Sequence, residues 1–423
     1  MTPQIKQRID QIRRGEVPEG YKKTKVGIVP AEWEEVRLGD AFAERTENNY
    51  SNAELLSITG NKGVVRRTEI EGKDNSSVDK SSYKHICAGD IGYNTMRMWQ
   101  GVSALSSLEG IVSPAYTVLI PQCNVSAKYY SYVFKLQNMI NVFYRNSQGL
   151  VDDTRSLKYE WFKMIQVSSP SLPEQMKIAE VLETQDKVIA LYEKKIEEMK
   201  KLKKAFLQKI FPKSGATVPE WRFPGFTDAW EQRKLSEYLA VSNEKNKDNM
   251  YSRNDVFSVS GDYGVVNQIE FQGRSFAGAA LDNYGIVETG DVVYTKSPLN
   301  SAPYGIIKAN KIKPGIVSVL YAVYRPLANC NPDFVQTYFE QDARLNNYLR
   351  PLISKGAKNT INVSDEAALN GDVVFPGVDE QKLISSLFMR LDNLITLHQR
   401  LCDEEKQKKK TLMQLLLAGI VRV

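Results

Sequence analysis

The second half of this chain repeats the first half, and this duplication limits the possible folds more than any other sequence feature. Residues 174–211 align with 380–417 without a gap at a constant offset of 206, and 11 of the 38 aligned positions are identical. Shorter matches occur upstream at slightly smaller offsets, as between the segments that begin at Trp33 and Trp230. A duplication with so long a period predicts two copies of one domain in a pseudo-two-fold arrangement. Such a molecule would contact its target twice.

Each copy ends in a stretch with the periodicity of a long helix. The first is expected to begin at Glu174 and to end near Phe211, because Pro212 follows at once. At 1.5 Å per residue, its 38 residues would span about 57 Å. Seven of the nine seam positions from Leu182 to Ile210 are apolar and follow the four-three spacing of a coiled coil. We therefore expect each helix to pair with the helix of the other copy.

The two bodies that precede these helices read as mixtures of short strands and helices, so the expected class is α+β. In the first body the expected elements are strands at 53–59, 89–95 and 111–120 and a helix at 127–144. In the second body they are strands at 256–260, 291–295 and 316–324 and a helix at 333–348. A short amphipathic helix is expected at 4–14.

Composition indicates an intracellular, weakly basic globular protein of 423 residues. Lys and Arg number 56 against 50 Asp and Glu, a net charge of +6, so a positive surface for a polyanion would have to be local. No apolar run approaches the ~18 residues of a membrane span, and the N-terminus lacks a secretory signal, which predicts a cytoplasmic location. The cysteines are expected to be buried, reduced thiols, because they form no CxxC pattern: Cys87, Cys123, Cys330 and Cys402.

Catalytic motifs are absent from the sequence. It contains no phosphate-binding loop, no GxGxxG, no HExxH and no Asn-Pro-Pro-Tyr or Asp-Pro-Pro-Tyr tetrapeptide. His85 and His398 are the only histidines, which argues against a histidine triad or a metal site. His398 falls on the helix seam, where a packed role is the simpler interpretation. The chain is therefore predicted to bind rather than to catalyse, with no catalytic residue, metal or cofactor of its own.

The candidate binding residues are polar, basic or aromatic side chains in loops of the two bodies. Arg reads guanine and Asn or Gln reads adenine, while Lys, Ser and Thr hold phosphates. In the first body the candidates are Lys62, Arg66, Arg67, Asn94, Arg97, Trp99, Gln100, Gln148 and Arg155. In the second body they are Tyr263, Gln268, Arg274, Lys296, Asn300, Lys355, Lys358, Asn359 and Thr360. Any one of them is more simply a solvated surface residue, but similar loops in both copies favour DNA binding.

Lysine clusters on the two helices could contact the DNA backbone between two recognition sites. They comprise Lys200, Lys201, Lys203 and Lys204 and, in the second copy, Lys406, Lys408, Lys409 and Lys410. A solvated helix face with acidic residues as intrahelical partners explains them equally well.

Taken together, these motifs resemble the specificity subunit of a type I restriction–modification system. The resemblance covers nearly the whole chain and rests on four repeated features. These are Trp-Glu-x-x-(Arg/Lys)-Leu from Trp33 and Trp230, Gly-Asp-(Ile/Val) from Gly89 and Gly290, the loop Gly149…Arg155 or Gly356…Thr360, and above all a proline shortly before Glu174-Gln175 and Glu380-Gln381. Asp379 stands where the first copy has its second proline, a small departure.

The resemblance implies two α/β target recognition domains joined by a long antiparallel two-helix coiled coil. The expected divisions are an N-terminal helical segment at 1–27, recognition domains at 28–172 and 216–375, and conserved helices at 173–215 and 376–423. Residues 1–27 would pack near the end of the C-terminal helix. Each domain would read one half of a bipartite double-stranded DNA target, and the helices would set the spacer. Two methyltransferase subunits that use S-adenosylmethionine would dock there, and restriction subunits would join them.

Two other classes of function remain open from the sequence. The chain could be a non-catalytic scaffold that binds proteins through its coiled coil and contacts no DNA. It could also be the recognition portion of a fused restriction–methylation enzyme, although the missing catalytic motifs count against this.

Overall fold

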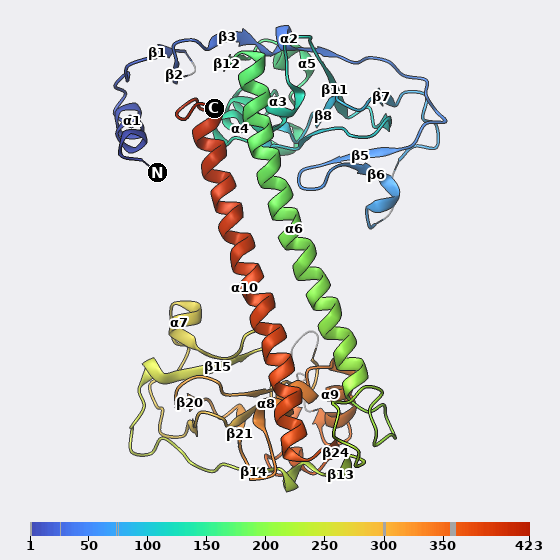
Figure 1. Ribbon diagram of the computed structural model, residues 1–423, viewed down its shortest axis with the longest axis vertical. Coiled ribbons are helices and arrows are strands. Elements are labelled where there is room, and N and C mark those ends of the chain that lie inside the picture. Colours follow the sequence, from blue (N-terminus) through green and yellow to red (C-terminus); the bar gives the residue numbers. More distant parts are fainter. Residues whose placement is uncertain (1, 26, 73, 75, 299–301, 356–360) are drawn as a thin grey trace. The chain divides into compact units, whose positions relative to one another are not determined.

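The computed structural model describes residues 2–25, 27–72, 74, 76–298, 302–355 and 361–423 (Figure 1). The chain divides into two compact units. Unit 1 combines residues 1–193 with Arg400–Val423, and unit 2 is Lys194–Gln399. Both units therefore contain part of each long helix, α6 (Leu172–Ile210) and α10 (Val378–Leu416). None of the helices among the described residues has the length and apolar character needed to cross a membrane.

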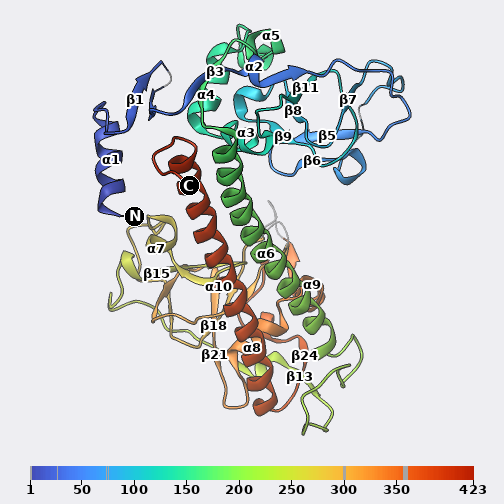
Figure 2. The same ribbon diagram turned by 45° about the horizontal axis from the view of Figure 1, so that its top comes forward.

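Within each unit, the parts of α6 and α10 that belong to it lie side by side (Figures 1 and 2). In unit 1 the seam residues Leu182 and Ile189 of α6 are buried, as is Cys402 of α10. In unit 2, Ile210 and Phe388 are buried on the corresponding faces. The four-three spacing thus identified the inward face of both helices, and the helix starts differ from the prediction by only two residues.

Unit 1 is built around a four-stranded antiparallel sheet in the order β4-β11-β8-β9. These strands are β4 (Phe42–Glu44), β8 (Ile91–Asn94), β9 (Ser103–Leu105) and β11 (Tyr116–Pro121). Two-stranded ribbons surround it: β1 (Tyr21–Thr24) with β2 (Gly27–Pro30), β3 (Glu34–Arg37) with β12 (Gln166–Ser169), β5 (Leu56–Thr59) with β6 (Gly63–Arg66), and β7 (Lys84–Ile86) with β10 (Gly110–Val112). The short helices are α1 (Pro3–Arg13), α2 (Leu38–Ala41), α3 (Ala127–Val133), α4 (Gln137–Asn146) and α5 (Tyr159–Phe162).

Unit 2 repeats this architecture with the equivalent sheet order β14-β21-β18-β19. Its strands are β14 (Leu239–Val241), β18 (Val292–Thr295), β19 (Ile307–Ala309) and β21 (Tyr321–Pro326). A second sheet, in the order β16-β15-β20-β17, holds β15 (Val256–Ser260), β16 (Gly264–Asn267), β17 (Gly285–Val287) and β20 (Gly315–Val317). The remaining elements are β13 (Glu231–Lys234) with β24 (Asp372–Phe375), β22 (Ser354–Lys355) with β23 (Ile361–Asn362), and helices α7 (Gln268–Gln272), α8 (Pro332–Tyr338) and α9 (Asp342–Leu349).

The Glu-Gln pair at the start of each long helix joins that helix to the body of its unit. Gln175 is buried; its amide donates to the Pro170 carbonyl at 3.0 Å, and its Oε1 accepts from the Ser126 amide at the start of α3. Gln381 makes the same two contacts in unit 2, with Pro376 at 2.9 Å and Asn331 at 2.9 Å. These bonds fasten each long helix to the body of its unit.

The glutamate of the pair is buried in a bidentate ion pair. Glu174 is held by Arg422 at 2.6 and 2.9 Å, and Glu380 by Arg222 at 2.8 Å to both oxygens. Each arginine belongs to the segment that follows the other long helix. The repeated Glu-Gln motif is therefore explained by packing within each unit.

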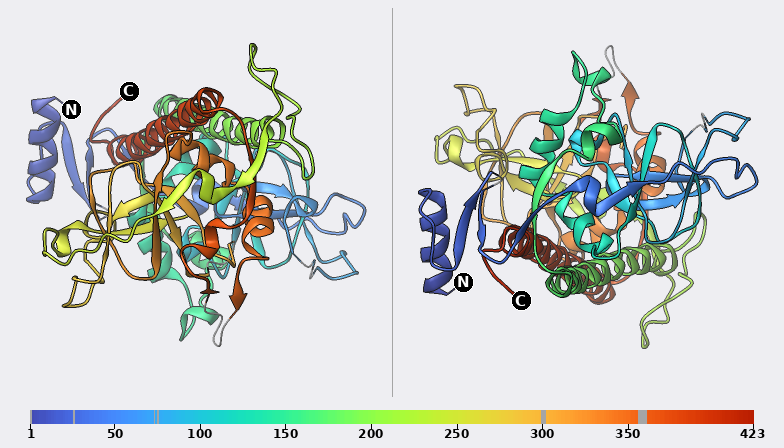
Figure 3. Two further views of the ribbon diagram at one scale, coloured as in Figure 1. Left: turned by 90° about the horizontal axis from the view of Figure 1, so that it is seen from below. Right: turned by 90° about the horizontal axis from the view of Figure 1, so that it is seen from above.

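The N-terminal segment contacts the C-terminal turn of unit 1. The Arg8 guanidinium donates to the Ile420 carbonyl at 2.6 Å, and the Tyr21 hydroxyl donates to the Gly419 carbonyl at 2.7 Å. Helix α1 buries no residue fully and lies at the edge of the unit (Figure 3).

Several predictions of secondary-structure elements were wrong in detail. The helix expected at 127–144 is two helices, α3 and α4, because the chain turns after Phe134 and so brings the buried rings of Phe134 and Phe143 to 5.5 Å. The helix expected at 333–348 is likewise split into α8 and α9. The strands expected at 111–120 and 316–324 each break at a turn and divide between two sheets. Cys123 is exposed and Cys87 is half-buried, so the prediction of buried thiols holds only for Cys330 and Cys402.

Candidate nucleic-acid interface

The first predicted segment of unit 1 is the β5–β6 hairpin. The Thr59 hydroxyl accepts from the Lys62 amide at 2.9 Å, and Gly63 adopts a left-handed φ of 76°, which closes a three-residue turn with Lys62 exposed. Arg66 is paired with Glu54 at 2.8 Å and Glu69 at 3.3 Å. Arg67 lies 3.5 Å from Asp74. Lys62 is thus the most available cation of the three, and both arginines would have to exchange carboxylates for a nucleic acid.

Two other predicted segments of unit 1 meet in a cluster of Trp99, Tyr144 and Arg155. The rings of Trp99 and Tyr144 lie edge to face at 5.8 Å, and the Arg155 guanidinium lies 4.0 Å above the Tyr144 ring. The same guanidinium donates to the Tyr144 hydroxyl at 3.2 Å. Arg97 and Gln100 are exposed beside this cluster in the sequence. Aromatic faces with an adjoining guanidinium suit contact with bases. Tyr144, exposed on α4, was missed by the sequence analysis.

The loop that carries Gln148 and Arg155 is closed on itself. Backbone bonds join Gln148 and Ser156 in both directions, at 2.9 and 2.7 Å. Gly149 lies inside this closure with a φ of 141°, and a Cβ there would be 2.7 Å from the Thr154 carbonyl oxygen. Leu150 at the tip is fully exposed. The closure fixes where Arg155 leaves the loop.

Replacing Gly149 with alanine is expected to open this loop, because neither the φ angle nor the space accommodates a side chain. Arg155 would leave Tyr144, and the affinity of the chain for duplex DNA should fall at least about ten-fold, or ~1.4 kcal/mol. A fluorescence-anisotropy titration measures this. Gly60→Ala is the matched control, because a Cβ there meets only Val102 at 3.8 Å. Equal DNA affinities of the Gly149→Ala and Gly60→Ala variants would contradict the assignment of this loop to the nucleic-acid interface.

Lys135 links two of the predicted segments and was missed from the sequence. Its ammonium donates to the Gly101 carbonyl at 2.7 Å and to the Gly60 carbonyl at 3.3 Å, so it joins the hairpin turn to the segment that contains Trp99. Burial and, to a smaller extent, the nearby Lys409 together lower the pKa of Lys135 to about 8. Nothing in its sequence context distinguishes it from a solvated lysine.

Replacing Lys135 with methionine is expected to remove a pH dependence of stability. Between about pH 8, the folded value, and the usual pKa of 10.5, the unfolded chain holds a proton that the folded chain has released. The unfolding free energy of the wild type should therefore rise with pH across this window relative to Lys135→Met, and the difference should be constant below it. Guanidinium denaturation at a series of pH values measures this. Lys128→Met, a half-buried position on α3 whose lysine pairs with Glu183, should show the same rise with pH as the wild type. A rise that persists in Lys135→Met would refute the assignment of this pH dependence to Lys135.

In unit 2 the exposed candidates gather around the β15–β16 turn and α7. Tyr263 occupies the turn equivalent to Lys62, is 70% exposed, and lies 5.2 Å from the Phe271 ring. Arg274 lies 4.7 Å from the exposed Phe276 ring. Phe271 and Phe276 were missed from the sequence because exposed phenylalanines cannot be told from core residues by pattern alone.

Other predicted residues of unit 2 already have partners within the unit. The Gln268 amide donates to the Ser258 hydroxyl at 2.7 Å and accepts from the Phe276 amide, which fixes α7 to its strand. Lys296 is paired with Asp365 at 2.7 Å. Asn94 of unit 1 is similar, since its Oδ1 accepts from the Met96 amide. Lys355 lies on β22, and Asn300, Lys358, Asn359 and Thr360 lie outside the described residues.

One group in unit 1 has the residue types of a metal site, namely His85, Cys87 and Glu109. The two His85 ring nitrogens contact carboxylates, Glu47 at 3.3 Å and Glu109 at 3.2 Å. The Cys87 sulfur lies at similar distances from both nitrogens, 3.8 and 4.0 Å, which places it away from the lone-pair direction of either. Burial raises the pKa of the Cys87 thiol, which disfavours a thiolate ligand. The group is therefore a hydrogen-bonded cluster.

Comparison with known proteins shows that this duplicated chain is similar to DNA-specificity proteins. The family described as the type I restriction modification DNA specificity domain matches residues 30–201. Two proteins of Methanocaldococcus jannaschii are 24% identical: the putative type I restriction enzyme MjaX specificity subunit, over 96% of this chain and 97% of the relative, and the type I restriction enzyme MjaVIII specificity subunit, over 96% of each chain. The crystal structure of the type I restriction–modification S subunit from M. genitalium has the same fold, with a TM-score of 0.55 at 13% identity over 91% of this chain and 96% of that one.

Both units have a mixed α/β structure. Over nearly its whole length the chain is similar to specificity subunits of type I restriction–modification systems.

Proposed function

We propose that this specificity subunit reads a bipartite DNA target, one half through each unit. Residues 28–172 and 216–375 would be the two target recognition domains. The observation that carries the proposal is that both units share one strand order and expose basic and aromatic side chains at equivalent hairpins, with Lys62 in one turn and Tyr263 in the other. Two recognition surfaces on one chain suit two separate stretches of major groove. The subunit would act in the cytoplasm, without a cofactor of its own.

The base contacts are proposed to come from candidate residues that are exposed or that pack against an exposed aromatic ring. Trp99, Arg155 and Gln148 would act in unit 1, and Tyr263 and Arg274 in unit 2, because these side chains are exposed or stacked on exposed rings. Arg66, Arg67 and Lys296 would contact phosphates only after leaving their carboxylate partners.

The helices are proposed to form a long antiparallel coiled coil through residues 173–215 and 376–423, related by a pseudo-two-fold axis. Two ion pairs support this. Lys409 pairs with Asp186 in unit 1 and Lys203 pairs with Asp392 in unit 2, and the two pairs are equivalent under the 206-residue offset. Residues 1–27 would complete the arrangement beside the end of α10.

Two methyltransferase subunits are proposed to dock on these helices, one at each equivalent face. Leu191 and Leu397 support this, because they are identical under the repeat and both are exposed, at 68% and 40%. Apolar residues kept exposed at equivalent positions suit two copies of one partner. The methyltransferase subunits would supply S-adenosylmethionine and adenine methylation, and restriction subunits would join them.

A paired deletion tests this arrangement. Removing four residues from each helix at equivalent positions, 193–196 and 399–402, shortens the helical connection by about 6 Å, close to two base pairs. The methylated target should then keep both half-sequences with a spacer shorter by one or two base pairs, as read by modification sequencing. An altered half-sequence with an unchanged spacer would count against the proposal, and loss of all sequence preference would favour a protein-binding scaffold.

A further inference from the structure

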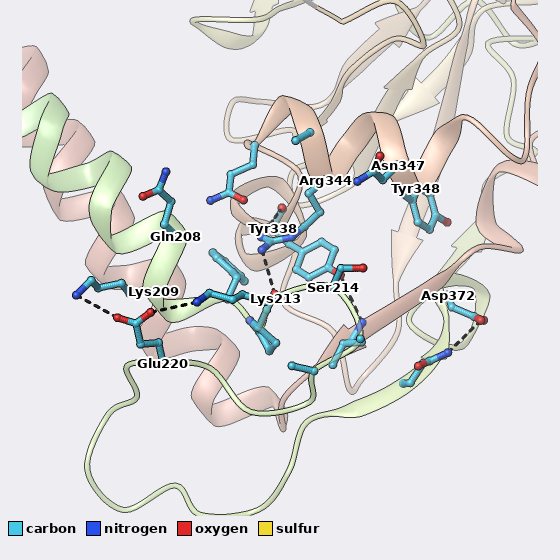
Figure 4. Close-up of a pocket in the computed structure, with 18 residues that line it drawn as sticks. Gln208, Lys209, Lys213, Ser214, Glu220, Tyr338, Arg344, Asn347, Tyr348 and Asp372 are labelled. Atoms are coloured by element: carbon cyan, nitrogen blue, oxygen red, sulfur yellow. Dashed lines mark hydrogen bonds and ion pairs between the residues drawn. The ribbon is translucent and has the colours of Figure 1, made fainter.

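A cavity of about 690 Å³ lies within unit 2 (Figure 4), and none of the residues predicted to contact DNA lines it. Its walls are the last turn of α6, the following segment 211–216, helix α9, and strands β13 and β24. Polar groups from three of these elements line it, including Gln208, Ser214 and Asn347. Its size is that of a small-molecule site.

Arg344 of α9 lines this cavity as a half-buried cation. Its guanidinium lies 4.7 Å from the rings of both Phe211 and Tyr338. It donates to the Tyr338 carbonyl at 3.3 Å and weakly to the Pro212 carbonyl at 3.5 Å. Among the described residues, no carboxylate forms an ion pair with it, and burial lowers the pKa of Arg344. A desolvated cation held this way costs stability unless an anion joins it.

The other copy shows that the fold does not require a cation at this position. Aligning Phe134 with Phe339, both buried one turn before the second helix, places Met139 opposite Arg344. Met139 is buried in the aromatic core of unit 1. The arginine is therefore a feature of unit 2 alone, and methionine is a substitution that this architecture already accepts.

Further cations stand at the mouth of the cavity. Lys209 lies 3.2 Å from Glu220, and Lys213 lies 3.7 Å from the same carboxylate with its side chain 81% exposed. Asp372, the other acid in the lining, accepts from Gln232 at 3.2 Å. Three cations against two carboxylates leave the lining positive, and Lys213 can leave Glu220 at little cost.

We propose that this cavity binds the phosphate group of a small phosphorylated molecule, with Arg344 as its direct ligand. The flat guanidinium offers a fork for two oxygens, and the mobile Lys213 and the Ser214 hydroxyl can meet the third. The volume leaves room for a nucleotide-sized remainder against Tyr338 and Tyr348. A carboxylate would need only the fork, so the added cation favours phosphate.

Calorimetric titration of the full chain with inorganic phosphate, at ionic strength held constant with chloride, tests the proposal. One saturable site is expected in the wild type, at least ten-fold weaker in Arg344→Met and unchanged in Arg350→Met, an exposed arginine at the end of α9. Arg344→Met should melt no lower than the wild type. Absence of saturable binding, or equal binding by the two variants, would overturn the proposal.

Two further arms keep the test decisive. Lys213→Met combined with Ser214→Ala leaves the packing of α9 intact and should also weaken phosphate binding; unchanged binding would contradict the assigned ligands. Adenosine monophosphate should compete with phosphate, whereas competition by duplex DNA alone would mean that the site serves the DNA backbone and not a small molecule.

Discussion

Replacing Glu380 with alanine is expected to lower the free energy of unfolding by about 3–5 kcal/mol, the usual cost of breaking a buried ion pair by removing one partner. Glu380 is 1% exposed and the Arg222 side chain only 15%, so the guanidinium would be left without its bidentate acceptor. The change also removes a negative charge from the first turn of α10. Denaturation of the full chain, followed by a probe in unit 2, measures the loss.

The equivalent change in unit 1 provides the control. Arg422 is 40% exposed and also pairs with Glu32 at 2.8 Å, so it keeps a partner when Glu174 is replaced. Glu174→Ala should therefore cost less than half as much as Glu380→Ala. Equal losses of unfolding free energy in the two variants, or a loss under about 1 kcal/mol for Glu380→Ala, would show that the Glu380–Arg222 ion pair does not hold the helix as its geometry indicates.

Replacing residues 31–170 with the matching body of another specificity subunit is expected to change one half of the DNA target completely and leave the other half unaltered. The candidate segments of unit 1 are held by contacts inside that unit: Lys135 to Gly60 and Gly101, and Arg155 to Tyr144. None of these contacts depends on residues of unit 2. Modification sequencing of host DNA gives both half-sequences in one experiment.

Replacing only the closed loop, residues 148–156, is the narrower control for this exchange. It should alter at most a few positions of the same half-sequence, because the hairpin and Trp99 remain. A change in both halves after either replacement would mean that the two units do not read DNA independently.

The long helices were predictable because their signal is local and repeated. The seam residues recur at four-three spacing over four heptads, from Leu182 to Ile210, and the observed start, Leu172, lies two residues from the predicted one. The turn at Ser113-Pro114 could also have been predicted from the sequence, because proline has no backbone N–H to donate to a neighbouring strand. A single strand was nevertheless predicted across it. The break after Phe134 carries no such mark, because only the packing of Phe134 against Phe143 shows why the helix must turn.

The sequence predicted the types of residue at the candidate site, but it did not predict which of their side chains are available to contact DNA. Loop position identified Arg66, Gln268 and Lys296, but each already has a partner within its unit. The partners named above lie 10 to 69 positions away in the sequence, so the pairing leaves no pattern in the chain. For the same reason, the sequence alone does not distinguish Lys135 and Arg344 from ordinary surface cations. The structure is needed to show their burial and their hydrogen-bond partners.

Base-modification sequencing of host DNA, after this chain is expressed with the methyltransferase subunit proposed as its partner, tests the central claim most directly. The predicted result is one new bipartite motif, methylated at adenine on both strands and absent when this chain is omitted. A complex that co-purifies and methylates no new motif would contradict the claim that the two units confer DNA specificity.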